Sequence, residues 1–195
     1  IANQGVQSGQ TNAEHKITKC ERTGALPLSY GQQRLWFLWQ LDPNSTAFHV
    51  QHAVRLMGEL NLHALRVSLS DLIGRHEALR TNYAVGGTGI VEQVIAPSLQ
   101  LPLPVIDLTA IPQSEHDRRI QMEATRLLSQ PFDLTRDPLL RVAVIRLSDH
   151  EQILVIVMHH IVSDAASLQI LLDELAVDYQ AQVQQRLANL PALPV

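Results

Sequence analysis

Two adjacent histidines and an aspartate, His159, His160 and Asp164, are the residues of this chain best suited to chemistry. They follow the apolar run 153–158, whose length and β-branched side chains predict a buried strand. Imidazole exchanges protons close to neutral pH, and a rigid strand holds it in a defined place. We therefore expect a general base at the end of this strand.

Successive side chains of a strand point to opposite faces, so only one of His159 and His160 can face a reaction site. We expect the other to be buried and hydrogen-bonded to backbone. Asp164 lies beyond the strand and has three interpretations: a general base, a metal ligand, or an anchor that pairs with an arginine. A zinc site is disfavoured, because adjacent strand histidines diverge and no further histidine follows at helical spacing. Ser163 lacks the glycines of a nucleophile elbow, which disfavours a covalent serine mechanism.

Composition narrows the partners of the chain. Its 195 residues are 46% hydrophobic, which is sufficient for the core of one domain or two small ones. The formal net charge of −4, without a lysine or arginine run, disfavours nucleic acid and anionic membranes as main partners. The single cysteine, Cys20, cannot form an internal disulfide. No signal peptide and no apolar run long enough to cross a bilayer is present, so a cytoplasmic location is expected.

The elements that must position the histidines follow from periodicity and from capping residues. Ser29 and Gln32 form a capping box, Asn61 can cap a second helix, and the turn 86–89 is rich in glycine. We expect helices at about 29–41, 61–76, 114–128 and 167–187, strands at about 48–56, 79–85, 90–95, 139–147 and 153–158, and an extended piece at 103–108. This order predicts an α/β (α+β) domain, a mixed sheet with helices on one or both faces. No glycine-rich phosphate loop is present.

Three stretches of this sequence resemble signatures of the condensation domains of nonribosomal peptide synthetases. They are the first signature at 29–38 (SYGQQRLWFL), the second at 75–83 (RHEALRTNY) and the paired-histidine motif at 158–164 (MHHIVSD). Tyr83 stands where phenylalanine is usual, and Ala165 stands where the third motif normally continues with glycine. If that glycine needs a left-handed backbone angle, Ala165 is strained; if the angle is ordinary, Ala165 is harmless.

The resemblance implies a chloramphenicol-acetyltransferase-like N-terminal lobe over residues 26–190, with a polar lead-in at 1–25 and the start of a truncated connection at 191–195. It implies that the parent enzyme joins donor and acceptor thioesters, each tethered to a carrier protein, through an amide bond. It further implies that no cofactor is bound directly, since the phosphopantetheine arms belong to the carriers. The C-terminal lobe of the same domain is the further partner, and the isolated fragment is expected to be inactive.

The resemblance also implies a role for each site residue. His160 positions or deprotonates the amine of the acceptor, His159 supports the fold, and Ala165 lies close to substrate through its backbone. Asp164 forms a salt bridge with an arginine of the second signature, Arg75 or Arg80, with Arg75 the first choice. A tailoring enzyme that epimerises or transfers an acyl group, and a non-catalytic lobe that docks carrier proteins, remain as alternatives.

Overall fold

The computed structural model describes residues 24–193. Cys20, most of the predicted lead-in and the last two residues of the predicted connection lie outside this range. The helices are α1 (Tyr30–Leu41), α2 (Leu62–Arg75), α3 (Gln113–Leu128) and α4 (Ala165–Val183), with a 3₁₀ turn at Glu77–Arg80. The strands are β1 (Leu26–Pro27), β2 (His49–Met57), β3 (Thr81–Val85), β4 (Val91–Ile95), β5 (Val105–Asp107), β6 (Leu140–Ser148) and β7 (Glu151–His159).

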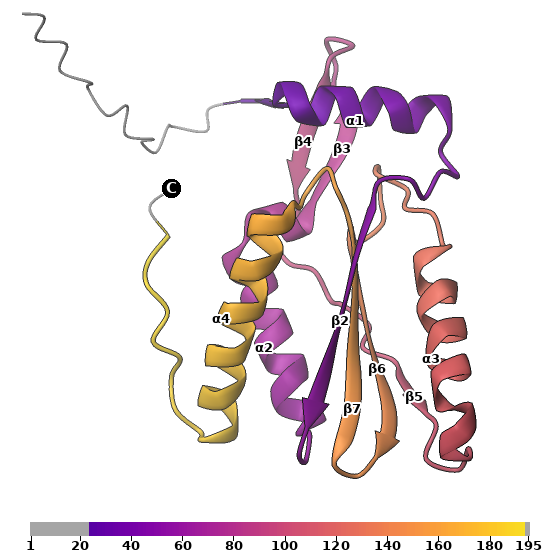
Figure 1. Cartoon of the computed structure of the whole chain (residues 1–195). Helices are drawn as coiled ribbons and strands as arrows, with labels where there is room; N and C mark the ends of the chain where they lie inside the picture. Colours follow the sequence, from indigo (N-terminus) through magenta and orange to yellow (C-terminus); the bar gives the residue numbers. More distant parts are fainter. Residues whose placement is uncertain (1–23, 194–195) are drawn as a thin grey trace, which may run out of the picture.

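The strands form two sheets. The larger has the order β2-β7-β6-β5, in which β5 runs parallel to β6 and the other neighbours are antiparallel. The smaller has the order β1-β4-β3. In Figure 1, α2 and α4 lie together on one side of the larger sheet, α3 lies on the other side, and α1 crosses above its upper end. The predicted mixed sheet flanked by helices is therefore confirmed, with helices on both faces.

The alternation of side chains along β7 divides the core in two. Ile153, Val155 and Val157 belong to a cluster that includes Trp36 of α1, the buried Leu127 of α3 and residues of the following loop. Leu154, Ile156 and Met158 belong to a second cluster with the apolar faces of α2 and α4. Both faces of β7 are thus covered, which explains why its sequence is a continuous apolar run without alternation. This burial gives the end of β7 a rigid base.

Of two helix ends, one has the capping hydrogen bonds that the sequence predicts and the other has a closure that the sequence does not predict. At the start of α1, the Ser29 side chain accepts from the Gln32 N–H and the Gln32 side chain accepts from the Ser29 N–H, which confirms the capping box. At the end of α4, Gln185 takes a φ of 53° and Arg186 N–H reaches the Ala181 carbonyl. This is a Schellman closure, and it ends the helix at Val183 although its pattern predicts a longer one.

The connection between α2 and β3 differs from the prediction. Residues 77–80 form a 3₁₀ turn, so that the strand predicted from residue 79 begins only at Thr81. The turn is closed by the Thr81 hydroxyl, which donates to the Glu77 carbonyl at 2.7 Å. The β1 strand, with two residues, gives no periodic signal and was not expected.

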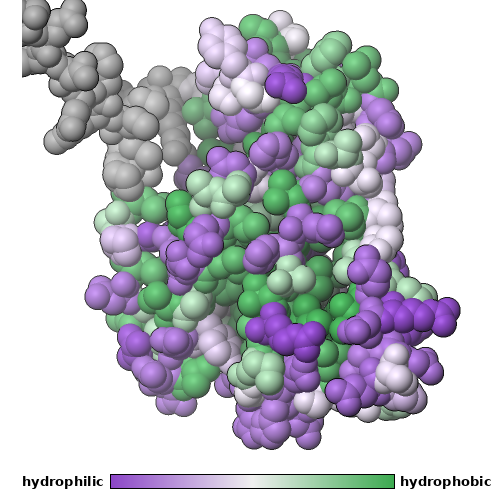
Figure 2. All heavy atoms as spheres, viewed as in Figure 1, coloured by the Kyte–Doolittle hydropathy of each residue, from purple (hydrophilic) through white to green (hydrophobic). Residues whose placement is uncertain are grey.

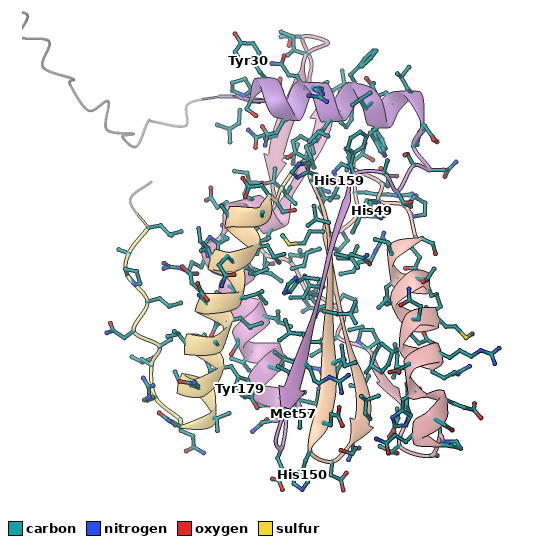
Figure 3. The ribbon with its side chains drawn as sticks, in the orientation of Figure 1. Tyr30, His49, Met57, His150, His159 and Tyr179 are labelled. Carbon is teal, nitrogen blue, oxygen red and sulfur yellow. The ribbon has the colours of Figure 1, made fainter. Side chains whose placement is uncertain are left out.

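One surface feature lies beside the exposed edge strand β2. Hydrophobic side chains gather along the middle of the face seen in Figure 2, between α4 and β2. A groove of about 420 Å³ lies there, lined among others by Leu56, Met57, Leu172 and Tyr179. It lies toward the lower end of the sheet, where Figure 3 labels Met57 and Tyr179, whereas His49 and His159 lie at the upper end.

The side chains of β7 that face α2 and α4 should contribute strongly to the stability of the domain. We expect Ile156→Ala to lower the free energy of unfolding by about 2–5 kcal/mol, because Ile156 is 1% exposed and its truncation leaves a cavity. Met57→Ala is the matched control, since Met57 is 75% exposed and its removal should cost less than about 0.5 kcal/mol. Urea denaturation monitored by circular dichroism measures both; equal losses would contradict the assigned burial.

Candidate active site at the end of β7

The histidine motif lies where β7 leaves the larger sheet. β7 pairs with β2 and with β6 along its length, and His159 lies opposite His49 in the β2 register. Figure 3 shows both histidines at the upper end of the sheet, below α1. The chain then makes the short loop 160–164 and enters α4. The site is therefore supported by a strand on one side and by a helix N-terminus on the other.

His159 is part of the core. It is 2% exposed, and its Nδ1 accepts a hydrogen bond from the Ile161 N–H at 3.1 Å, so the ring carries its proton on Nε2. Its neighbours are the rings of Phe132 and His49, whose centroids lie 6.2 and 6.1 Å away. Burial, with smaller contributions from His49 and His160, lowers the pKa of His159 to about 4. His159 is therefore a neutral structural group at working pH.

His49 shares this environment, although no pattern in the sequence identifies it as a partly buried residue. Its Nδ1–H donates to the Leu128 carbonyl at 2.8 Å, while its Nε2 is buried without a hydrogen-bond partner among the described residues. Burial, partly offset by that hydrogen bond, lowers the pKa of His49, and the nearby Arg141 contributes. Two neutral imidazoles thus pack against Phe132 beneath the loop. The strand alternation that places His49 inward depends on pairing with β7, which the local pattern does not reveal.

His160 has the opposite environment. Its side chain is exposed, and its backbone N–H donates to the Phe48 carbonyl at 2.8 Å. Its Nδ1 lies 2.5 Å from the Ser163 carbonyl oxygen, which can only accept, so Nδ1 carries the proton. The lone pair is then on Nε2, on the far side of the ring. A neutral imidazole in this tautomer can accept a proton at Nε2 while its orientation stays fixed.

The backbone of the loop is held by several hydrogen bonds. The Val162 N–H and the Ser163 hydroxyl both donate to the His159 carbonyl at 3.1 Å. The Tyr83 hydroxyl, from β3, lies 3.4 Å from the Ile161 carbonyl. His160 is therefore flanked on both sides by constrained peptide groups, which restricts the positions of its ring.

Asp164 is the N-cap of α4. Its carboxylate accepts from the Ser167 N–H at 2.7 Å, and its own N–H donates to the Ser167 hydroxyl at 2.7 Å. The hydrogen bond from the Ser167 backbone holds the pKa of the Asp164 carboxyl below its usual value. Within residues 24–193, the expected ion pair of Asp164 with Arg75 or Arg80 is not formed. Asp164 anchors the loop, but it does so through the helix end.

Arg75 and Arg80 have other partners. The Arg75 guanidinium binds Glu174 of α4 through two hydrogen bonds of 3.0 and 3.2 Å, and His76 donates to the same carboxylate at 2.6 Å. Burial raises the pKa of Glu174, but these hydrogen bonds outweigh it and hold the pKa below its usual value. Arg80 donates to the Ala96 carbonyl and lies 3.5 Å from Glu77. The second signature thus fastens α2 to α4 and the 3₁₀ turn to the end of β4.

Ala165 occupies an ordinary backbone conformation. It is the first residue of α4, and among the described non-glycine residues only Gln185 has a positive φ. The Cβ at this position therefore carries no conformational penalty of the left-handed kind. Ala165 is exposed beside Asp164, with its side chain on the surface.

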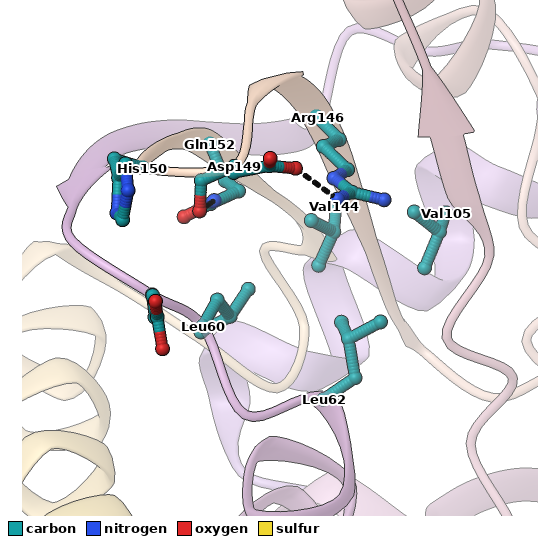
Figure 4. Close-up of a pocket in the computed structure, with 9 residues that line it drawn as sticks. Leu60, Leu62, Val105, Val144, Arg146, Asp149, His150 and Gln152 are labelled. Carbon is teal, nitrogen blue, oxygen red and sulfur yellow. Dashed lines mark hydrogen bonds and ion pairs between the residues drawn. The ribbon is translucent and has the colours of Figure 1, made fainter. Parts of the chain in front are cut away.

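A second cavity lies at the other end of β7. Its volume is about 420 Å³, and Leu60, Val144, Arg146 and Gln152 are among its lining residues (Figure 4). Arg146 is held by Asp149 at 2.5 Å across its edge. None of its lining residues belongs to the histidine motif, so this cavity is not part of the candidate site.

Neither a metal site nor a membrane span was found in the part of the chain that the structure describes. No group of three or more histidine, cysteine, aspartate or glutamate side chains in residues 24–193 could hold a metal ion. No helix in the same range is long and apolar enough to cross a membrane.

Solved structures share this arrangement of sheets and helices. The starter condensation domain of rhizomide synthetase RzmA matches 87% of this chain and 40% of its own chain, with a TM-score of 0.79 and 22% identity. The X-domain solved in complex with OxyB from teicoplanin biosynthesis matches 91% of this chain and 37% of its own, with a TM-score of 0.79 and 29% identity. The fold is that of one lobe of a condensation domain.

The chain belongs to the condensation domain family, whose sequence pattern it matches over residues 22–194. It is 40% identical over 188 residues to one of the linear gramicidin synthase proteins of Brevibacillus parabrevis, and 39% identical over 191 residues to chondramide synthase cmdD from Chondromyces crocatus. These alignments cover 96% and 97% of this chain but only 4% and 5% of the synthases. The chain therefore corresponds to a small part of such proteins.

The buried histidine should make stability depend on pH. Between the ordinary pKa of 6.5 and the folded value of about 4, the unfolded chain binds a proton at residue 159 that the folded chain does not. The free energy of unfolding should therefore fall by roughly 3 kcal/mol as the pH is lowered across this window, and this contribution should be constant above it. Urea denaturation at intervals from pH 7.5 to 4 measures this dependence.

His159→Asn should make that pH dependence less steep, whereas His52→Asn, on the exposed part of β2, should preserve it. An undiminished slope in a folded His159→Asn chain would show that the slope comes from other groups.

The partner of Arg75 can be identified by double-mutant cycles. Glu174→Gln should cost about 2 kcal/mol of unfolding free energy, because the hydrogen bonds from Arg75 lose their ionised acceptor. Asp164→Ala should cost about 1 kcal/mol through loss of the helix cap.

In the double mutant Arg75→Leu with Glu174→Gln, the loss of unfolding free energy should differ from the sum of the two single losses. In Arg75→Leu with Asp164→Ala, the two losses should add. The reverse pattern would restore the pairing of Asp164 with Arg75.

Proposed function

We propose that this chain is the histidine-bearing N-terminal lobe of a condensation domain that forms amide bonds between carrier-tethered thioesters. The observation that carries the proposal is the environment of His160. Its Nδ1 is committed to the Ser163 carbonyl at 2.5 Å, its side chain is exposed, and its Nε2 is left to accept a proton. This is the arrangement that an amine acceptor requires, since amide formation releases a proton from nitrogen.

The reaction assigns a limited task to each residue. The acceptor amine attacks the carbonyl carbon of the donor thioester, the new C–N bond forms, the C–S bond breaks, and the donor arm leaves as a thiolate, which becomes the free thiol when it takes up the proton that the amine has lost. His160 Nε2 orients the amine and accepts its proton. His159 remains neutral and holds the loop from below, and Asp164 holds it from the helix end.

The partners of the proposed reaction are two carrier proteins, one for the donor and one for the acceptor. Their phosphopantetheine arms are part of the substrates, so the domain itself needs no bound cofactor for this step. The chain aligns with only 40% of the RzmA domain, and we propose that a second, C-terminal lobe completes the site. We propose a cytoplasmic location, where such carriers would be encountered.

A lobe that only docks other proteins is the second candidate. One structural relative, the X-domain, was solved in complex with OxyB. The intact histidine pair and the fixed tautomer of His160 favour catalysis over this alternative. A tailoring reaction, epimerisation or acyl transfer, would use the same histidine on other substrates.

The test is amide formation by the completed domain. With the C-terminal lobe restored and loaded donor and acceptor carriers supplied, intact protein should give the amide product by mass spectrometry. His160→Ala should lower the rate by about 10²–10⁴-fold, the usual contribution of a general base. His150→Ala, at the turn beyond the other end of β7, should keep the rate of the intact domain.

No product from a folded intact domain over several substrate pairs would contradict condensation. Inverted stereochemistry of a residue on a single carrier would then indicate epimerisation. Equal rates for intact protein and His160→Ala would remove His160 from the chemistry.

A further inference from the structure

A chain of hydrogen bonds connects α1 with the loop that carries His160. Gln32 Oε1 accepts from the Ser29 N–H at 2.9 Å, which fixes the amide at the first turn of the helix. Its Nε2 donates to the Tyr83 hydroxyl at 3.2 Å, and this hydroxyl lies 3.4 Å from the Ile161 carbonyl. Gln32 belongs to the first signature, Tyr83 to the second, and Ile161 to the histidine motif.

The direction of each hydrogen bond is determined by the groups present. The Gln32 amide nitrogen only donates and the Ile161 carbonyl only accepts, so the Tyr83 hydroxyl receives the first bond and supplies the second. Burial raises the pKa of Tyr83 to about 12, and the hydroxyl therefore keeps its proton at working pH. Tyr83 is 0% exposed, so that water does not readily replace either partner.

These hydrogen bonds end at the backbone of Ile161, the residue next to His160. The Ile161 N–H is bound by the His159 ring, and its carbonyl is bound by Tyr83. The hydrogen bond between Nδ1 of His160 and the Ser163 carbonyl joins residues on either side of Ile161. A shift of Ile161 would therefore change the distance that determines which nitrogen of His160 carries the proton.

We propose that Tyr83, held by Gln32, is a positioning residue that fixes the orientation and tautomer of His160 through the Ile161 carbonyl. The hydroxyl is the group by which Tyr83 differs from the phenylalanine of the signature that this stretch resembles. The ring alone would fill the core beside Trp36, whose centroid is 6.3 Å away. The hydroxyl therefore adds a polar connection to a position that is otherwise apolar. This inference rests on the proposed role of His160 as the base.

The first experiment reads the state of His160 without substrate. In the chain with ¹⁵N-labelled histidine, ring nitrogen shifts report the tautomer, and His160→Asn identifies the signals of that residue. We expect Nδ1 to be protonated in the intact chain and a mixture of both tautomers in Tyr83→Phe. A folded Tyr83→Phe chain with the tautomer of the intact chain would overturn the proposal.

Tyr179→Phe is the matched control. Its hydroxyl accepts from the Asn61 N–H at 2.9 Å at the far end of the sheet, so the substitution removes a hydrogen-bonded hydroxyl without touching the loop. It should alter stability and leave the signals of His160 unchanged. A change as large as that of Tyr83→Phe would show that any loss of packing disturbs His160, and the specific role would be rejected.

Gln32→Glu tests the same series of hydrogen bonds without removing the Tyr83 hydroxyl. It can therefore test the proposal even if Tyr83→Phe fails to fold. A carboxylate keeps the acceptor for the Ser29 N–H but replaces the donor toward Tyr83. The Tyr83 hydroxyl should then turn toward residue 32 and leave the Ile161 carbonyl. We expect the mixed tautomers of His160 again; an unchanged ring in folded Gln32→Glu would contradict the proposal.

Kinetics in the completed domain separate this inference from the proposed function. Tyr83→Phe should lower kcat for amide formation about tenfold with KM nearly unchanged, since small displacements of a positioned group reduce the rate of the chemical step. If the intact domain forms no amide but the tautomer of His160 still depends on Tyr83, the proposed function fails and the positioning role stands. If the amide forms and the tautomer is independent of Tyr83, only the positioning role fails.

Discussion

The pairing and burial of β7 is the constraint on which the rest of the structure depends. β7 lies inside the larger sheet, with β2 on one edge and β6 on the other, and apolar clusters cover both of its faces. A strand satisfied on every side cannot shift along its axis without breaking two ladders at once. The position at which the chain leaves the sheet is therefore fixed, and the loop 160–164 begins from a defined point.

The two histidines show how sharply the environment changes at that point. His159 is the last residue of the ladder and lies among aromatic rings, where a charged imidazole is disfavoured by burial. His160 follows it directly and is exposed, with its orientation set by the Ser163 carbonyl. Adjacent residues of the same type thus serve a structural purpose and a proposed chemical purpose because one peptide bond separates the core from the surface.

Much of this fold could be predicted because its signals are local. The capping box of Ser29 and Gln32, the glycine turn before β4 and the apolar run of β7 each lie within a few residues, and the structure contains all three features. The Schellman closure at Gln185 could not be foreseen, because glutamine has no strong preference for a left-handed conformation.

The site was less predictable because its contacts join distant segments. The family resemblance suggested Asp164 as the partner of Arg75, whereas Glu174 lies within reach of Arg75 across the packing of α2 on α4. Nothing in the neighbourhood of Glu174 distinguishes it from the other acidic residues of α4. The pairing of His49 with His159 likewise exists only once β2 and β7 are in register. Tyr83 was visible as a departure from the usual phenylalanine, but its link to Ile161 was not.

The separation of β2 from β7 along the chain has a consequence for biosynthesis. β2 leaves the ribosome well before β7, which is its only sheet neighbour within the described residues. Until then, the hydrogen-bonding groups of both edges of β2 are unpaired, and such nascent edges favour association with other chains. Pauses in translation between these two strands would prolong that vulnerable interval. The yield of native protein should thus depend on the rate at which the ribosome translates the segment between β2 and β7.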